Sequence, residues 1–139
     1  VFLAKKGYKV TGIDISSVAV KKAQLLAKEN KVKINTVVAN LDKYKMEKES
    51  LDGIVCFYYV DRALNKRMVS WLKPGGILIY EAYTIRQRTK KNENKSYSSY
   101  YLKEQELLNM FDGMKVIKYE EPADEKVYRA SIVLQKPYK

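Results

Sequence analysis

Polar and aromatic side chains stand at the ends of three apolar runs of this chain. Asp14 closes the first run, Asn40 and Leu41 follow the second, and Phe57 begins an aromatic group at the end of the third. A carboxylate at the end of a strand can accept two hydrogen bonds from a ribose diol. A side-chain amide can bond an adenine edge, and a leucine can pack on its face. These residue types are therefore suited to binding a nucleoside.

Each position also has a simpler explanation. Asp14 can cap a helix or lie on the surface, and Asn40 can belong to an ordinary turn. Phe57, Tyr58 and Tyr59 can wall a flat or cationic ligand, since aromatic faces attract cations. Some of them can instead pack in the core, because successive residues of a strand face opposite sides. The residues taken singly leave both explanations open.

Basic residues supply a second kind of candidate. Arg62 follows the third apolar run, where it can bind an anionic substrate or form a structural ion pair. Arg86 opens a basic stretch, Arg86–Lys95, within a long polar segment that spans 84–101. Loops of this length are often lids or binding loops. We therefore expect either a solvated loop or a lid that attracts an anionic substrate.

The composition limits the classes of protein that remain. The chain has 139 residues, 46% hydrophobic and 31% charged, which predicts one globular domain over 1–139. It contains no His, so it lacks the commonest metal ligand and the usual general base, and we expect no metal site. Its single cysteine, Cys56, cannot form an internal disulfide, which is typical of a cytoplasmic protein. No apolar run is long enough to span a bilayer, so we expect no membrane association.

Hydrophobic periodicity predicts alternating helices and strands that end in a hairpin. The expected strands are 8–15, 33–39, 51–58, 77–83, 114–121 and 127–135, and the expected helices are 1–6, 16–29, 61–72 and 104–111. This order predicts an α/β fold with a mostly parallel sheet and a C-terminal antiparallel hairpin. In such sheets ligands bind beyond the carboxyl ends of the strands. The strand-end residues are therefore the ones to consider.

Four segments in this order resemble a known family. They are Val10–Ser16 (VTGIDIS), Ala39–Asp42 (ANLD), Asp52–Cys56 (DGIVC) and Leu72–Glu81 (LKPGGILIYE). The ordered set resembles class I S-adenosylmethionine-dependent methyltransferases, most closely the small bacterial group that includes tellurite-resistance methyltransferases. The resemblance runs over nearly the whole chain. It implies a Rossmann-like sheet, methyltransferase activity and S-adenosylmethionine as cofactor.

The resemblance also implies roles for single residues. Asp14 would hold the ribose hydroxyls, and Ile15 would lie against the adenine. Asn40 would contact the adenine amino group. The other cofactor residues would be Phe57 and Tyr58, which match the strand-end segment that lines the methyl-transfer region. Apart from the resemblance, we expect Tyr58, Tyr59, Arg62, Tyr83 and Arg86 to line the acceptor site. Methyl transfer from a sulfonium depends mainly on positioning of the acceptor, and the sequence identifies no general base.

One part of the family pattern is absent from the sequence. The family's first strand and its glycine-rich loop precede the helix that begins this chain at Val1. We therefore expect an incomplete, N-terminally truncated methyltransferase domain with the first strand missing. The loss of a central strand exposes strand edges and apolar surface. By itself, this chain is expected to bind the cofactor weakly or not at all.

The net charge of +11 supports an alternative of another class, a nucleic-acid-binding module or a nucleic-acid methyltransferase. Tyrosines interleave with the basic stretch, which permits stacking with bases. However, the lysines are spread along the whole chain, and the strand-end segment Phe57–Val60 (FYYV) lacks the motifs of nucleic-acid methyltransferases. A nicotinamide-dependent oxidoreductase shares the strand and Asp pattern, but the C-terminal hairpin disfavours it. We expect a small-molecule acceptor, anionic in character, and no nucleic acid.

Overall fold

The structure is a computed structural model that describes residues 1–90, 99–123 and 126–139, with only the backbone described at 88–90. The chain forms two compact units, Val1–Lys45 and Met46–Lys139. The second half of the basic stretch, and with it the expected lid, lies outside the described residues. Among the described residues, no helix has the length and apolar character needed to cross a bilayer.

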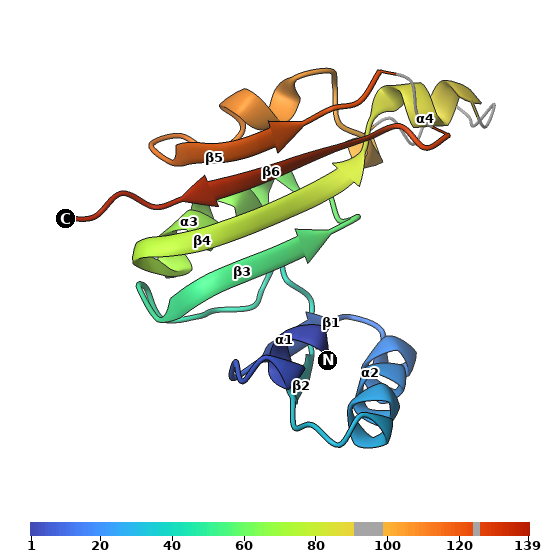
Figure 1. The fold of residues 1–139 in the computed structure, drawn as a ribbon, viewed down its shortest axis with the longest axis vertical. Helices are drawn as coiled ribbons and strands as arrows, with labels where there is room; N and C mark the ends of the chain where they lie inside the picture. The colour runs from blue at the N-terminus through green and yellow to red at the C-terminus, as the bar shows by residue number, and fades with distance from the viewer. Residues whose placement is uncertain (91–98, 124–125) are drawn as a thin grey trace. The chain divides into compact units, whose positions relative to one another are not determined.

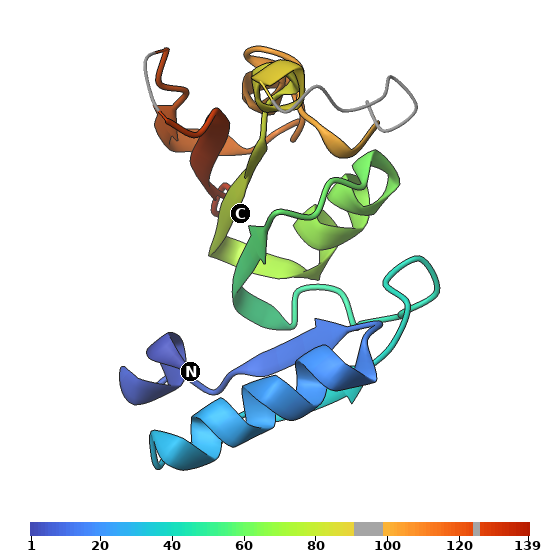
Figure 2. The ribbon, with the colours of Figure 1, turned by 90° about the vertical axis from the view of Figure 1, so that its right-hand side faces the viewer.

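The first unit is built on a pair of parallel strands. Its elements are α1 (Phe2–Lys5), β1 (Thr11–Asp14), α2 (Ser17–Glu29) and β2 (Asn35–Val38). The register places Thr11 opposite Asn35 and Asp14 opposite Val38. Helix α2 lies along the strand pair (Figures 1 and 2) and buries Val20 there. The carboxyl ends of both strands therefore lie at one end of the unit.

The turn from β1 into α2 is fixed by two side chains. The Ser16 hydroxyl accepts a hydrogen bond from the Ala19 amide at 3.2 Å, so Ser16, and not Ser17, caps the helix. The Ser16 amide in turn donates to Asp14 Oδ1 at 2.8 Å. These bonds satisfy amide groups that a first helical turn leaves without partners.

The second unit contains a four-stranded sheet in the order β3-β4-β6-β5 (Figure 1). These strands are β3 (Leu51–Phe57), β4 (Leu72–Tyr83), β5 (Lys115–Glu120) and β6 (Arg129–Gln135). Strand β3 is parallel to β4, whereas β6 is antiparallel to both β4 and β5. The predicted α/β class and the C-terminal antiparallel hairpin are confirmed. Within the described residues the two sheets together hold two parallel and two antiparallel strand pairs.

One face of this sheet forms the core of the second unit. Alternate residues of β4 and β6 are at most 1% exposed on that face, namely Leu78, Tyr80, Ala82, Ala130, Ile132 and Leu134. Helix α3 (Asn65–Trp71) covers this core with Met68 and Trp71, and the 3-10 helix η3 (Glu106–Asn109) buries Leu107. The residues of β4 on the opposite face, such as Ile79 and Glu81, are only part-buried. The period of two in β4 thus produces one fully covered face.

The helix predicted over 61–72 is shorter than expected and begins differently. It opens with the 3-10 turn η1 (Arg62–Leu64), in which Asp61 Oδ1 accepts the Ala63 amide at 2.9 Å. Helix α3 ends at Trp71 because Leu72 already pairs with Leu51 as the first residue of β4. Gly75 lies within β4, where its left-handed backbone (φ 78°) accompanies a shift in the register between β3 and β4.

Two further predictions were wrong about local structure. The helix expected over 104–111 is reduced to η3, because Gln105 before it adopts a left-handed backbone with φ 58°. The polar segment after Tyr83, expected as a loop, contains helix α4 (Ile85–Lys90). Here the buried Gln87 side chain accepts the Tyr128 amide at 2.8 Å. This contact joins two residues that are 41 positions apart in the sequence, and it holds the helix in place. A local sequence pattern therefore cannot predict the helix.

Candidate functional site

The first unit brings Asp14 and Asn40 to the same end of its strand pair. The Ala39 amide donates to the Asp14 carbonyl at 3.0 Å, and Asn40 is the next residue. Ile15, which follows Asp14, is 70% exposed, and Leu41 is half-buried. This is the edge at which parallel α/β sheets bind ligands.

The Asp14 carboxylate is exposed and has a free oxygen. Its Oδ1 accepts the Ser16 amide, whereas Oδ2 has no hydrogen-bond partner among the described residues. An ionised carboxylate accepts hydrogen bonds on both oxygens. Asp14 therefore supports the turn into α2 and still offers an oxygen to a ligand hydroxyl.

Asn40 lies in an ordinary turn, which was one of the two explanations that the sequence left open for it. Its Oδ1 accepts the Asp42 amide at 2.9 Å, and its carbonyl accepts the amides of Lys43 and Tyr44 at 3.1 and 3.0 Å. The Asn40 side chain is thereby oriented by its own turn. Its contact with a nucleobase stays a prediction.

The second unit joins Phe57, Tyr58 and Tyr83 into an aromatic cluster at the carboxyl ends of β3 and β4. The Tyr58 ring stacks on Tyr83 with centroids 4.7 Å apart and an interplanar angle of 28°. Phe57 lies 6.4 Å from Tyr58, measured between ring centroids. Tyr58 is 50% exposed and Phe57 53%, so neither packs in the core.

Glu81 and Arg129 hold this cluster, and neither was assigned a site role from the sequence. The Tyr58 hydroxyl donates to Glu81 Oε1 at 2.8 Å, and Arg129 Nη1 lies 3.7 Å from the same oxygen. The bond to Glu81 raises the pKa of Tyr58, so its phenol stays neutral. An acid within the apolar run of β4 was a usable signal for Glu81. Arg129 comes from β6 and has no local signal.

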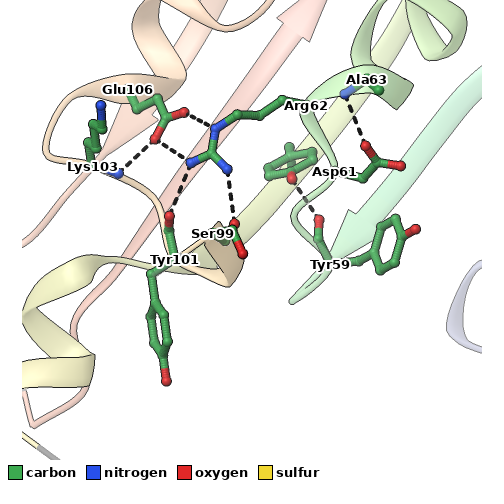
Figure 3. Close-up of polar contacts among 9 residues, drawn as sticks. Tyr59, Asp61, Arg62, Ala63, Ser99, Tyr101, Lys103 and Glu106 are labelled. Carbon is green, nitrogen blue, oxygen red and sulfur yellow. Dashed lines mark hydrogen bonds and ion pairs between the residues drawn. The ribbon is translucent and has the colours of Figure 1, made fainter. Parts of the chain in front are cut away.

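Arg62 lies at the centre of a hydrogen-bond network (Figure 3). Its Nε and Nη2 donate to the two carboxylate oxygens of Glu106 at 2.6 and 2.9 Å. Nη1 donates to the Ser99 carbonyl at 2.9 Å, and Nη2 also donates to the Tyr101 carbonyl at 3.1 Å. This is the structural ion pair that the sequence left as an alternative. The substrate-binding role of Arg62 stays a prediction.

The charges of this network are stabilised by its own contacts. Burial opposes ionisation of Glu106, but hydrogen bonds from Arg62 and from the Lys103 amide outweigh it and hold the pKa of Glu106 below its ordinary value. A cavity of about 550 Å³ opens beside the network, and Arg62, Asn65 and Lys103 are among the residues that line it.

The Tyr59 backbone is fixed from the core of the same unit. Its carbonyl, labelled with Tyr59 in Figure 3, accepts the Tyr80 hydroxyl at 2.6 Å and lies 3.7 Å from Cys56 Sγ. Burial raises the pKa of the Cys56 thiol to about 11, so the thiol stays protonated and is a poor nucleophile. Tyr59 as a whole remains 40% exposed.

Arg86 lies on α4 and contacts a different set of residues. Its Nε is 4.0 Å from Glu104 Oε1, and its guanidinium lies 4.6 Å from the centroid of the Tyr128 ring. These three residues line a cavity of about 230 Å³. The arginine expected to attract an anion is thus already paired with a carboxylate.

Comparison with known proteins identifies similar sequences. The family model described as a methyltransferase domain matches residues 1–76. The ubiquinone biosynthesis O-methyltransferases of Rickettsia canadensis and Rickettsia akari are 33% identical over 82 residues and 31% identical over 94 residues. These matches cover 55% and 64% of this chain but 34% and 36% of the relatives. The aligned part therefore spans about a third of the length of each relative.

Solved structures share the fold at low sequence identity. The [4+2]-cyclase SpnF has a TM-score of 0.78 at 14% identity, and the match covers 99% of this chain and 69% of that one. TehB from Haemophilus influenzae has a TM-score of 0.76 at 17% identity, with 97% and 52% covered. A methyltransferase from Methanosarcina mazei has a TM-score of 0.71 at 20% identity, with 99% and 86% covered. Because one fold hosts different reactions, these likenesses establish the fold alone.

Proposed function

We propose that this chain, which belongs to the methyltransferase domain family, is part of an enzyme that transfers a methyl group from S-adenosylmethionine to a small organic acceptor. The family match over residues 1–76 includes more than half of the chain. It confirms the resemblance to class I methyltransferases inferred from the motifs. The names of the two Rickettsia relatives, both O-methyltransferases, support an acceptor with a hydroxyl group.

The observation that carries the proposal is the exposed carboxylate of Asp14 at the end of β1. One of its oxygens is held by the Ser16 amide, and the other has capacity for a ribose hydroxyl. Asn40 follows the neighbouring strand, and Ile15 exposes an apolar surface beside Asp14. These residue types fit the adenosine part of the proposed cofactor.

The cofactor, when bound, supplies a methyl group that is already activated as a sulfonium substituent. The residues of the chain then need only to bind and orient the reactants. We assign Phe57 and Tyr58 to the methyl-transfer region, and Tyr59 and Tyr83 to the acceptor side. Arg62 and Arg86 are weaker candidates, because each would have to leave a carboxylate partner to bind an anion.

Substitution of Asp14 tests the proposal in the protein that contains this chain. Asp14→Asn keeps an oxygen for the Ser16 amide but replaces the second acceptor oxygen with an NH2 donor. We expect S-adenosylmethionine affinity, measured by titration calorimetry, to fall about 10-fold in Asp14→Asn and about 10- to 100-fold in Asp14→Ala, since hydrogen bonds to charged groups contribute roughly 1.5–3 kcal/mol.

Asp112→Asn is the matched control, because Asp112 is an exposed aspartate in a turn of the other unit. Its S-adenosylmethionine affinity should equal that of the unmodified protein. Unchanged affinity in both Asp14 variants would refute the role of Asp14, and a protein that contains the chain but binds no S-adenosylmethionine would refute the proposed function.

A further inference from the structure

The backbone of Tyr58 has an unusual conformation. Tyr58 is the first residue after β3, and its φ of 57° lies in the left-handed region that residues other than glycine seldom adopt. Its amide still donates to the Glu81 carbonyl at 2.7 Å. Strained conformations of this kind persist where surrounding contacts enforce them, and they are concentrated at functional sites.

Three side chains determine where the Tyr58 ring lies. Tyr83 stacks against it, and Glu81 accepts its hydroxyl. Arg129 lies 3.7 Å from the same Glu81 oxygen and so balances the charge of the carboxylate. The ring is therefore held by a stack, a hydrogen bond and a backbone bond, yet half of the residue remains exposed.

The hydrogen bond between Tyr58 and Glu81 does not by itself require Tyr58 to be exposed, as a second tyrosine of the same unit shows. Tyr80 also donates its hydroxyl to a fixed acceptor, the Tyr59 carbonyl, but Tyr80 is 1% exposed. Tyr80 thus serves the core, whereas Tyr58 presents ring surface at the carboxyl ends of two parallel strands. In α/β sheets this edge is where ligands bind.

We propose that the exposed part of the Tyr58 ring is a stacking platform for a planar aromatic acceptor, and that Glu81 and Arg129 are positioning residues that hold the platform. This inference rests on the proposed function and names the class of its acceptor. A ligand ring would extend the stack that Tyr83 and Tyr58 already form.

The charges in this unit favour an uncharged ring over the anion expected from the sequence. Arg129 pairs with Glu81, Arg62 with Glu106, and Arg86 faces Glu104. Each of these guanidinium groups is thus offset by a carboxylate. Phe57 and Tyr59, the chain neighbours of Tyr58, are also exposed, so aromatic side chains accompany Tyr58 at this edge.

Binding of two matched probes tests the platform. Catechol and trans-cyclohexane-1,2-diol carry two adjacent hydroxyls, but only catechol is planar and aromatic. We expect the protein that contains this chain to bind catechol about 2- to 12-fold more tightly, the range that a stacked ring pair provides. Ligand-observed NMR titration measures both affinities without any need for turnover.

Variants separate the platform from the residues that hold it. Tyr58→Leu should reduce the ratio of catechol to diol affinity to about 1, whereas Tyr58→Phe should keep most of the preference because the ring remains. Glu81→Gln, which still accepts the tyrosine hydroxyl, should also keep it, and Glu81→Leu should lower it. Tyr8→Leu is the control, since Tyr8 is an exposed tyrosine of the other unit.

The outcomes distinguish this inference from the proposed function. A catechol preference that survives Tyr58→Leu overturns the platform. If Tyr58→Leu also lowers the affinity for S-adenosylmethionine while the catechol preference is unchanged, Tyr58 belongs to the cofactor site. In that case the platform is overturned, but the methyltransferase proposal remains intact. A protein that binds no S-adenosylmethionine but shows the Tyr58-dependent preference would refute the proposed function alone.

Discussion

At the scale of residues, the ion pair between Arg62 and Glu106 shows how a partly buried pair differs from a surface pair. The side chain of Glu106 is 19% exposed and that of Arg62 is 41% exposed. The guanidinium satisfies both carboxylate oxygens and two backbone carbonyls at once. Two-point pairing of this kind fixes geometry as well as charge. Arg62 therefore ties the start of η1 to the segment that begins at Ser99.

Glu106→Gln should lower the free energy of unfolding at pH 7 by about 1 kcal/mol, a value reduced for the partial exposure of Arg62. The pKa of Glu106 is depressed in the folded protein, so its stabilisation is complete above its ordinary pKa and is lost as the pH falls through the lowered value. Urea unfolding at several pH values should show the difference between the two proteins shrinking below about pH 4.

Glu104→Gln is the control for this comparison. Its carboxylate lies 4.0 Å from Arg86, and its side chain is 64% exposed, so the expected change in unfolding free energy is close to zero. A Glu106→Gln effect that is equally large at acidic pH would show that packing, and not the ion pair, is responsible.

At the scale of elements, the turn from β1 into α2 determines where Asp14 is presented. The N-cap of α2 is Ser16, and Ser17 is the first residue of the helix. The Ser16 hydroxyl accepts from Ala19, while the Ser16 amide donates to Asp14. The same residue thus starts the helix and fixes the carboxylate proposed to bind ribose.

Ser16→Ala should destabilise the first turn of α2 by about 1 kcal/mol, because the Ala19 amide loses its acceptor. Hydrogen exchange measured by NMR should show the Ala19 amide exchanging about 5-fold faster, the factor that corresponds to this energy. Ser17→Ala is a matched control one residue away, in which exchange should not change. Equal effects in the two variants would contradict the assignment of the cap.

At the scale of the whole molecule, basic residues occur throughout both units, whereas most acidic residues lie in the second unit. The unit Val1–Lys45 has ten lysines and three acidic residues, a net charge of +7, and the longer unit carries the remaining +4. A surface of this kind attracts any polyanion without specificity. Charge alone therefore does not support the nucleic-acid alternative.

Binding to DNA at increasing salt distinguishes a general charge effect from a dedicated site. We expect fluorescence anisotropy with a duplex oligonucleotide to show weak binding that disappears by about 200 mM salt, while S-adenosylmethionine affinity changes little. Heparin, a polyanion without bases, should follow the same salt dependence as the DNA. Retention of DNA affinity at 200 mM salt, with heparin already released, would favour the nucleic-acid methyltransferase alternative.

The limits of prediction are visible in particular residues. Most strands, the helix α2 and the terminal hairpin followed from apolar periodicity, because that signal is local. The ends of elements did not follow, since Leu72 leaves the helix to pair with Leu51, and α4 depends on the contact between Gln87 and Tyr128. In both cases a partner distant in sequence outweighs the local preference.

The sequence by itself determined the α/β class, the family and the placement of Asp14, Asn40 and the aromatic residues at strand ends. These features depend on residue order and on hydrogen bonds between near neighbours. Only the tertiary structure decided that Arg62 pairs with Glu106, 44 residues away, and that Glu81 and Arg129 hold Tyr58. The reason is that these contacts join separate elements, and strand order and packing set their geometry.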